Sequence, residues 1–295
     1  MAKYQFYIVD VFAEEKYAGN QLAVVRDAAD ISDSQMLRIT KEMNYSETTF
    51  ILSNEPREGG YDVRIFTPAA EVPFAGHPTL GTAYIIQLEV MKEPAETVIL
   101  NLKVGQIPVT SGAAGKDKDI LWMKQQEPAF GRTIEPGPVS RVLGLNESEI
   151  DERFIVQEVS TGLPFIIVPL KGLDAVKRAK VNRDEYFELI ENTQAKMILV
   201  FCPETYNRDN DLNVRVFCDY FGIPEDPATG SGNGCLAGYL VKHRYFGSDK
   251  IDIRVEQGYE ISRPSLLYLR AENKQGKIDV SVGGKVVMIA KGQLL

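Results

Sequence analysis

Residues 74–86 read Phe74-Ala75-Gly76-His77-Pro78-Thr79-Leu80-Gly81-Thr82-Ala83-Tyr84-Ile85-Ile86. Residues 229–241 read Thr229-Gly230-Ser231-Gly232-Asn233-Gly234-Cys235-Leu236-Ala237-Gly238-Tyr239-Leu240-Val241. Each stretch begins with glycine and hydroxyl residues, which suit a helix start, and continues as an almost wholly apolar helix. A helix that is apolar on every side must be enclosed by other elements. The sequence therefore predicts two buried helices, each covered by strands of its own half of the chain.

The elements around the two stretches also repeat. A strand-like Val-Arg run precedes each helix (62–66 and 213–217), a second strand-like run precedes that one (49–52 and 197–201), and a glycine turn follows. The spacing is 151 residues between Arg64 and Arg215, 155 between Tyr84 and Tyr239, and 153 between Gly105 and Gly258. Landmarks that recur in the same order at nearly constant spacing indicate an internal duplication.

We therefore expect an α+β fold of two similar domains, each a curved, barrel-like β-sheet around a central helix. The chain has 295 residues, enough for two domains. The expected domains are residues 1–118 and 119–285, with the strand near 286–295 joining the first. The loop 113–119 is the first boundary candidate, and the proline-rich stretch 127–138 is the second. Amphipathic helices are expected at 32–43 and 182–191, with Ser32 and Asn182 as N-caps.

Composition excludes several classes of function. There are 33 Lys and Arg against 41 Asp and Glu, so the formal net charge is −8, which argues against nucleic-acid binding. Only two histidines are present, too few for a three-histidine metal site. Three cysteines without a paired framework suit free thiols in a reducing cytoplasm. The first ten residues resemble a strand rather than a signal peptide, and no apolar stretch approaches the ~20 residues of a membrane span. We expect a cytoplasmic protein that contacts neither membranes nor nucleic acid.

Two turns are candidate anion-binding sites. Gly76 begins the first buried helix, and Gly230, Ser231 and Gly232 begin the second. Backbone N–H groups at a helix N-terminus favour an anion, and glycine allows a ligand to come close. Ordinary helix capping is the alternative. If the halves face each other, both helix ends would hold a small carboxylate in one cleft.

Three ionisable residues are candidates for proton transfer. Glu47 follows Ser46 where a helix passes into a strand, Asp226 precedes the second helix, and His77 follows Gly76. Burial raises a carboxyl pKa toward neutrality, which makes the group usable in acid/base catalysis. A capping glutamate, an Asp-Pro turn and a structural histidine are the alternatives. The cysteines are interpreted as core residues, and no metal-ligand spacing, phosphate loop or nucleotide-binding glycine motif is found.

The chain resembles the PhzF family of phenazine-biosynthesis isomerase-like proteins over nearly its whole length. The residues that carry the resemblance form six groups: Asp10-Val11-Phe12 with 19–25, Ser46-Glu47-Thr48-Thr49-Phe50, Arg64-Ile65-Phe66-Thr67-Pro68, 74–83, Ser160-Thr161-Gly162-Leu163-Pro164-Phe165, and Glu225-Asp226-Pro227-Ala228-Thr229-Gly230-Ser231. Gly232-Asn233-Gly234-Cys235 departs from the family pattern, where more Ala and Pro are expected, and this puts the shape of the substrate pocket in question.

The resemblance implies a fold like diaminopimelate epimerase, a site in the cleft between two halves, a homodimer and no cofactor. It also implies that Glu47 moves the proton, that His77 and Asp226 assist, and that Ser46 contacts the substrate. Thiol-dependent epimerases of the wider superfamily carry a cysteine before each helix-start glycine. Ala75 and Thr229 occupy those positions here, so a two-thiol mechanism is not expected.

The expected function is a cofactor-independent isomerase that shifts a proton on a small carboxylate. One alternative is a member of the family that binds a metabolite or a protein without catalysis, because a fold does not fix a function. A racemase of amino or hydroxy acids is a third hypothesis.

Overall fold

The computed structural model describes residues 4–93, 95–112 and 117–295, and the architecture is mixed α+β. The chain divides into two compact units: Met1–Met123 together with Gly283–Leu295, and Lys124–Val282. Four residues of the loop expected as a boundary, 113–116, lie outside the described residues. The first three residues of the expected N-terminal strand also lie outside them, and the strand is described from Tyr4 onward.

The first unit has nine strands in its described part. They are β1 (Tyr4–Val11), β2 (Asn20–Val25), β3 (Glu47–Ile51), β4 (Tyr61–Phe66), β5 (Glu71–Val72), β6 (Thr97–Leu102), β7 (Gly105–Ser111), β8 (Leu121–Lys124) and β18 (Val286–Leu294). β1 is antiparallel to both β18 and β2, β2 is parallel to β3, and β3 is antiparallel to β4. β4 is antiparallel to the short β5 and parallel to β6, and β6, β7 and β8 continue antiparallel.

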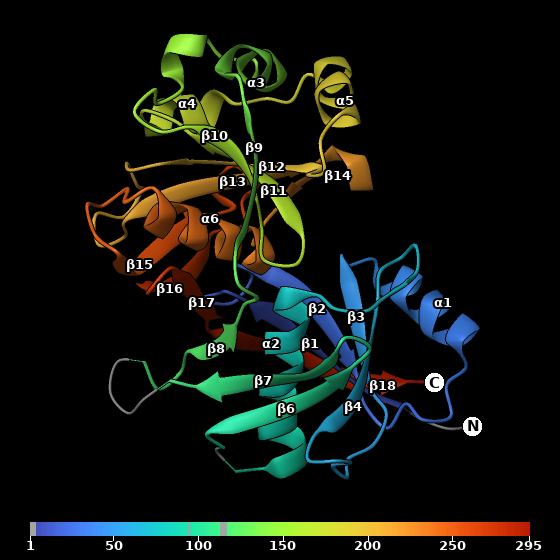
Figure 1. The fold of residues 1–295 in the computed structure, drawn as a ribbon. Coiled ribbons are helices and arrows are strands. Elements are labelled where there is room, and N and C mark those ends of the chain that lie inside the picture. The colour runs from blue at the N-terminus through green and yellow to red at the C-terminus, as the bar shows by residue number, and fades with distance from the viewer. Residues whose placement is uncertain (1–3, 94, 113–116) are drawn as a thin grey trace. The chain divides into compact units, whose positions relative to one another are not determined.

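Strands of the first unit pack against one buried apolar helix, α2 (Gly76–Ile85), which continues as a π-helical segment η1 (Ile86–Met91). α2 contacts β1, β2, β3, β6, β7 and β18, and Figure 1 shows it between β6 and β7 on one side and β1 and β2 on the other. A Cβ on Gly81 would lie only 2.6 Å from Leu22 and 2.9 Å from Val11, so glycine permits this close contact with the sheet. The expectation of an enclosed first helix is confirmed.

The opposite side of β2, β3 and β4 is covered by α1 (Asp33–Met43). Met36 of this helix packs with Val25, Phe50 and Phe66 in a small apolar core. The first helix predicted from amphipathicity is confirmed, because Ser32 caps α1 and forms a capping box with Gln35.

The second unit has nine strands in its described part. They are β9 (Ala129–Ile134), β10 (Val156–Ser160), β11 (Pro164–Pro169), β12 (Met197–Cys202), β13 (Leu212–Cys218), β14 (Ile223–Asp226), β15 (Lys250–Gln257), β16 (Ser265–Lys274) and β17 (Lys277–Gly284). β10 is antiparallel to β9 and β11, β11 is parallel to β12, and β12 is antiparallel to β13. β13 is antiparallel to the short β14 and parallel to β15, and β15 is antiparallel to β16.

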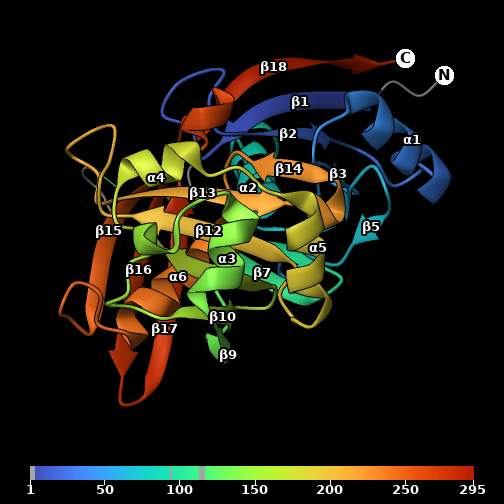
Figure 2. The same ribbon diagram turned by 90° about the horizontal axis from the view of Figure 1, so that it is seen from above.

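The helices of the second unit lie on both faces of its sheet. α3 (Pro136–Leu143), α4 (Leu173–Arg178) and α5 (Arg183–Glu191) gather on one face, and α6 (Gly230–Lys242) lies on the other, as Figures 1 and 2 show. The side chains of β12 point alternately to these two faces. Ile198 and Val200 pack with α3, α4 and α5, while the ring of Phe201 contacts Tyr239 of α6 at 5.9 Å between centroids.

Single turns of 3-10 helix complete the second unit: η2 (Glu147–Glu149), η3 (Asp219–Phe221) and η4 (Tyr259–Ile261). The second predicted amphipathic helix is confirmed as α5, and the side chain of its N-cap Asn182 accepts from the backbone of Asp184 and Glu185. No helix in the described part of the chain is both long and apolar enough to cross a membrane.

Candidate active site

Glu47 is the first residue of β3 and lies opposite Leu22 of the parallel strand β2. Because side chains alternate along a strand, Glu47 and Thr49 share a face of the sheet. The hydroxyl of Thr49 lies 2.8 Å from that of Thr82 on α2, so this face of β3 is joined to the central helix. Ser46, the predicted substrate contact, directly precedes the strand and is half-buried.

His77 is the second residue of α2, and its Nε2 lies 3.4 Å from Oε2 of Glu47. The side chains are 8% and 17% exposed, so the pair is close to fully removed from water. Burial lowers the pKa of His77 to about 3, and a hydrogen bond to the backbone of Gln21 acts in the opposite direction. The imidazole is therefore neutral at ordinary pH and can exchange a proton with a carboxyl group beside it.

The N-terminus of α2 lies at the same place in the first unit. Its N-cap, Ala75, has no side chain that could cap the helix, and the Thr79 hydroxyl donates back to the Ala75 carbonyl at 2.7 Å. Gly76 and His77 are the first two helical residues, so the N–H groups of the first turn adjoin the Glu47–His77 pair.

Asp226 is the last residue of β14 in the second unit, just before α6. The Thr229 hydroxyl donates to Oδ2 of Asp226 at 2.5 Å, and the side-chain amide of Gln257 donates to the Asp226 carbonyl at 2.8 Å. The predicted residues Gly230, Ser231 and Gly232 form the first turn of α6 directly after this cluster. The structure thus groups Glu47 with His77 in one unit, and Asp226 with the start of α6 in the other.

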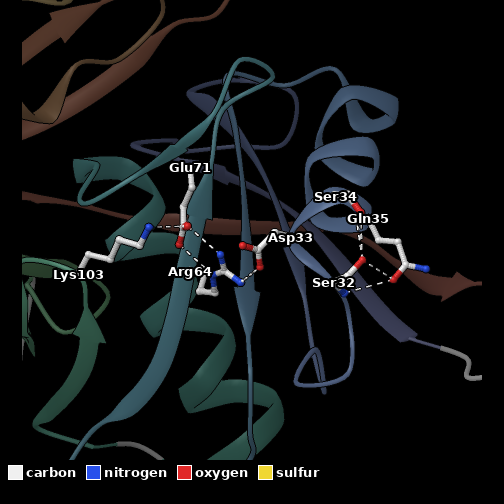
Figure 3. Close-up of polar contacts among 7 residues, drawn as sticks. All are labelled: Ser32, Asp33, Ser34, Gln35, Arg64, Glu71 and Lys103. Carbon is white, nitrogen blue, oxygen red and sulfur yellow. Dashed lines mark hydrogen bonds and ion pairs between the residues drawn. The ribbon is translucent and has the colours of Figure 1, made fainter.

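An arginine on a strand precedes each central helix in the chain. Arg64 of β4 makes two hydrogen bonds to Glu71 of β5, at 2.8 and 2.7 Å, and Figure 3 shows Asp33 and Lys103 completing this group. Arg215 of β13 makes the same pair of bonds to Glu225 of β14, at 3.0 and 2.7 Å. In both units the ion pair fixes the short strand that leads into the central helix.

Two residues of the second cluster, Gln257 and Thr229, have roles that the sequence does not predict. Gln257, at the end of β15, is fully buried and bonds to both Asp226 and Thr229. The sequence places Thr229 at the helix start and at the cysteine position of thiol epimerases, but it does not indicate the bond to Asp226. The available signal for Gln257 was its place beside Gly258, one of the repeated landmarks, but only the fold places β15 beside the start of α6.

The three cysteines are buried and free, as expected of core residues. Burial raises the pKa of Cys235 to about 11 and that of Cys202 to about 12, so neither is a thiolate near neutral pH. Among the residues described, no group of three or more His, Cys, Asp or Glu side chains is arranged to hold a metal ion.

Comparison with known proteins identifies relatives over the whole length. Residues 9–292 match the family model PhzC-PhzF, described as phenazine biosynthesis-like protein. An uncharacterised isomerase of Clostridium acetobutylicum is 30% identical, with 99% of this chain and 98% of that protein aligned. The trans-2,3-dihydro-3-hydroxyanthranilate isomerase of Pseudomonas aeruginosa is 32% identical, with 98% and 99% aligned. The crystal structure of a Bacillus anthracis phenazine biosynthesis protein of the PhzF family superposes with a TM-score of 0.92 at 26% identity, covering all of both chains.

Proposed function

Since this chain belongs to the PhzC-PhzF family of phenazine biosynthesis-like proteins, whose relatives here are named isomerases, we propose that it is an isomerase that shifts a proton on a small carboxylate substrate without a cofactor. The observation that supports this most directly is the Glu47–His77 pair, in which a carboxyl group and a neutral imidazole lie 3.4 Å apart, largely away from water, at a helix N-terminus.

In the proposed reaction, the Glu47 carboxylate removes a proton from an acidic carbon of the substrate and becomes a carboxylic acid. The electron pair of the broken C–H bond is delocalised into the conjugated system of the substrate. Glu47 then returns the proton to a different carbon as the double bonds move, and its carboxylate is regenerated. No atoms or electrons are gained or lost, so the step needs no oxidant and no second substrate.

The other predicted residues assist this transfer in the proposal. His77 relays a proton beside Glu47, taking one up as it gives one away, so its imidazole is neutral before and after the transfer and adds no lasting positive charge to the buried pair. Ser46 and the first-turn N–H groups of α2 at Gly76 are the substrate contacts proposed in the first unit. The first-turn N–H groups of α6 at Gly230, Ser231 and Gly232 are those proposed in the second. Asp226 orients a hydrogen-bond donor of the substrate.

The first compound to test is trans-2,3-dihydro-3-hydroxyanthranilate, because relatives aligned over the whole chain are named as its isomerases. It carries the carboxylate that the proposal requires.

We also propose that the two units arose by duplication and that each is a barrel-like sheet around its central helix. The support is the order of strand pairs. Starting from β18 in the first unit and β9 in the second, successive pairs are antiparallel, antiparallel, parallel, antiparallel, parallel and antiparallel in both. The expected division into an N-terminal domain completed by the strand near 286–295 and a C-terminal domain is part of this proposal. A homodimer is also part of it, and light scattering on the purified protein would test it.

The proposed function is tested by isotope exchange. The protein is incubated in D₂O with the candidate carboxylate, and NMR measures deuterium entering the substrate and formation of the isomer. The Glu47→Gln variant should lose about 10²–10⁴-fold in rate, as expected for a general base. Glu42→Gln, which changes an exposed glutamate of α1, is the matched control and should keep full activity.

The alternatives have distinct outcomes. Full turnover by Glu47→Gln on a confirmed substrate would show that Glu47 is not the base. A ligand that raises the melting temperature without any exchange would favour a non-catalytic binding protein, and loss of optical rotation without isomer formation would favour a racemase.

A further inference from the structure

Two buried amides adjoin the Asp226–Thr229 pair. Gln257 at the end of β15 and Asn233 in the second turn of α6 are both fully buried. Burying a side-chain amide is costly unless its donors and acceptors are matched. The hydrogen bonds of these two amides beside the Asp226 carboxylate therefore indicate which groups they position.

The orientation of the Gln257 amide follows from chemistry alone. One end lies 3.1 Å from the backbone N–H of Thr229, which can only donate, so this end is the oxygen Oε1. The other end lies 2.8 Å from the backbone carbonyl of Asp226, which can only accept, so this end is the nitrogen Nε2. If the amide were reversed, its nitrogen would face the Thr229 N–H and its oxygen would face the Asp226 carbonyl. Neither of these pairs can form a hydrogen bond.

The orientation of Gln257 determines the direction of the Thr229 hydroxyl. The second hydrogen on Nε2 points to Thr229 Oγ1 at 3.0 Å, so this oxygen accepts. A hydroxyl has only one hydrogen, and the carboxylate oxygen Oδ2 of Asp226 lies 2.5 Å away to receive it. A hydrogen bond donated to a carboxylate favours its charged form.

Asn233 completes the arrangement. Its Nδ2 donates to Oε1 of Gln257 at 2.9 Å and to the backbone carbonyl of Thr229 at 3.1 Å. With this bond, both hydrogens of the Gln257 amide and two acceptor directions of its oxygen are used, so the amide is held in one position. Asn233 is one of the residues that depart from the family pattern, and its effect is on this bond network within the fold.

We propose that Gln257, fixed by Asn233, is a positioning residue that turns the Thr229 hydroxyl toward Asp226 and keeps the Asp226 carboxyl ionised. This inference rests on the proposed function for its meaning. Asp226 then acts toward the substrate only as a negatively charged acceptor, and the migrating proton is carried by Glu47. The same network explains why Thr229, at the position of a catalytic cysteine in thiol epimerases, is no proton donor to substrate: its hydrogen is committed to Asp226.

Two carboxylates near Asp226, those of Glu225 on β14 and Glu256 on β15, are bonded to other partners. Arg215 on β13 is paired with Glu225, the residue before Asp226, and Glu256 directs its carboxylate to the backbone of Tyr206 and Asn207. The first-turn N–H groups of α6 favour a negative charge beside them. The ionisable residues on the elements packed around β14 are Arg215 and Cys218 of β13, Glu225 of β14, Asp219 and Tyr220 of η3, Glu256 of β15, Tyr259 and Glu260 of η4, and Arg263 in the turn that follows.

The test measures the Asp226 carboxyl directly. Aspartate labelled with ¹³C at the carboxyl carbon is titrated by NMR, and the Asp226→Asn variant assigns the signal. Thr229→Val removes the hydroxyl but keeps the shape of the side chain. It should raise the pH midpoint of the Asp226 carboxyl titration by about one pH unit or more. Thr229→Ser keeps the hydroxyl and should titrate like the wild type.

Further variants test the positioning role of Gln257 by the same titration of the Asp226 carboxyl. Gln257→Met, which does not touch the carboxyl oxygens, should raise the Asp226 midpoint in the same direction as Thr229→Val, and Asn233→Ala should raise it by less. An unchanged midpoint in a folded Gln257→Met protein would overturn the positioning role. Should that variant fail to fold, an unchanged midpoint in Asn233→Ala or in Thr229→Val would overturn it equally.

Turnover gives a second readout that a purely structural role would not move. On a confirmed substrate, the acidic limb of the kcat/KM profile should move to higher pH in Thr229→Val and return in Thr229→Ser. NMR midpoints that shift as expected while no carboxylate is turned over would refute the proposed function and leave the bond network in place. Turnover of a carboxylate together with Asp226 midpoints that do not shift in the variants would refute only the proposed role of the bond network.

Discussion

Replacing Arg215 with methionine should cost the second unit about 3–5 kcal/mol of folding free energy, the range for breaking a buried ion pair by removing one partner. The Arg215 and Glu225 side chains are only 9% and 7% exposed. Besides its two bonds to Glu225, the guanidinium donates through Nη1 to the carbonyls of Val176 and Ala179, each at 2.8 Å. Methionine fills similar volume but leaves a buried carboxylate without its cation and two carbonyls without their donor.

Arg64→Met in the first unit is the matched comparison. Arg64 makes the same two bonds to Glu71, but its side chain is 22% exposed and Glu71 keeps a second cation, because Lys103 Nζ lies 2.5 Å from its Oε2 (Figure 3). Water and Lys103 therefore compensate part of the loss, and we expect a cost of about 1–2 kcal/mol. Both variants remove a guanidinium that makes two bonds to a glutamate. A difference between their costs therefore reflects the burial and the neighbours of the two arginines.

Urea unfolding measures both costs. The single tryptophan, Trp122 on β8, reports on the first unit by fluorescence, while far-ultraviolet circular dichroism reports on both, so unequal loss can be assigned to a unit. Arg215→Met should also lower the melting temperature by about 6 °C or more, at roughly 2–4 °C per kcal/mol for units of this size. Equal losses in the two variants, or a larger loss in Arg64→Met, would refute the reasoning that burial and the second cation set the difference.

Three further outcomes are expected. The imidazole of His77 should remain neutral through pH 5 in ¹⁵N NMR spectra. Because its folded pKa of about 3 lies below the unfolded value of about 6.5, the unfolded chain binds the extra proton between these values. Stability should therefore fall as the pH drops through that window, and less steeply in His77→Asn; a protonated His77 at pH 6 would contradict this. Cys235→Ala should retain the isomerase activity and iodoacetamide should not inhibit the wild type, since the thiol is buried with a pKa of about 11, whereas inactivation by alkylation of Cys235 would indicate thiol chemistry. Ser32→Ala should lower stability by about 1 kcal/mol in thermal unfolding through loss of the α1 cap, with unchanged turnover; a drop in turnover would connect α1 to the site.

The sequence alone predicted the elements whose signals are local. Ser32 and Asn182 cap helices because a short polar side chain before an amphipathic run has few other roles. The two central helices followed from their uniform apolarity, and Glu47 and His77 followed from their place at a strand start and a helix start.

The bond network around Asp226 could not be predicted in the same way. Gln257 is 31 residues from Asp226 in the chain, and its one local signal, the neighbouring Gly258, does not show that it contacts Asp226. Its role depends on β15 running parallel to β13, which brings the end of β15 to the start of α6. In the sequence, Asn233 is only a departure from the family pattern. Its burial and its bond to Gln257 are visible only in the fold.

The position of β18 determines the order in which the chain can fold during synthesis. β1 pairs on one edge with β2 and on the other with β18, from Tyr4 opposite Leu294 to Val11 opposite Val286. The ribosome makes β18 only after residues 124–282, which form the second unit without interruption. The second unit can therefore close while β1 still presents an open edge, and a nascent first unit must wait for the last strand before its sheet is complete.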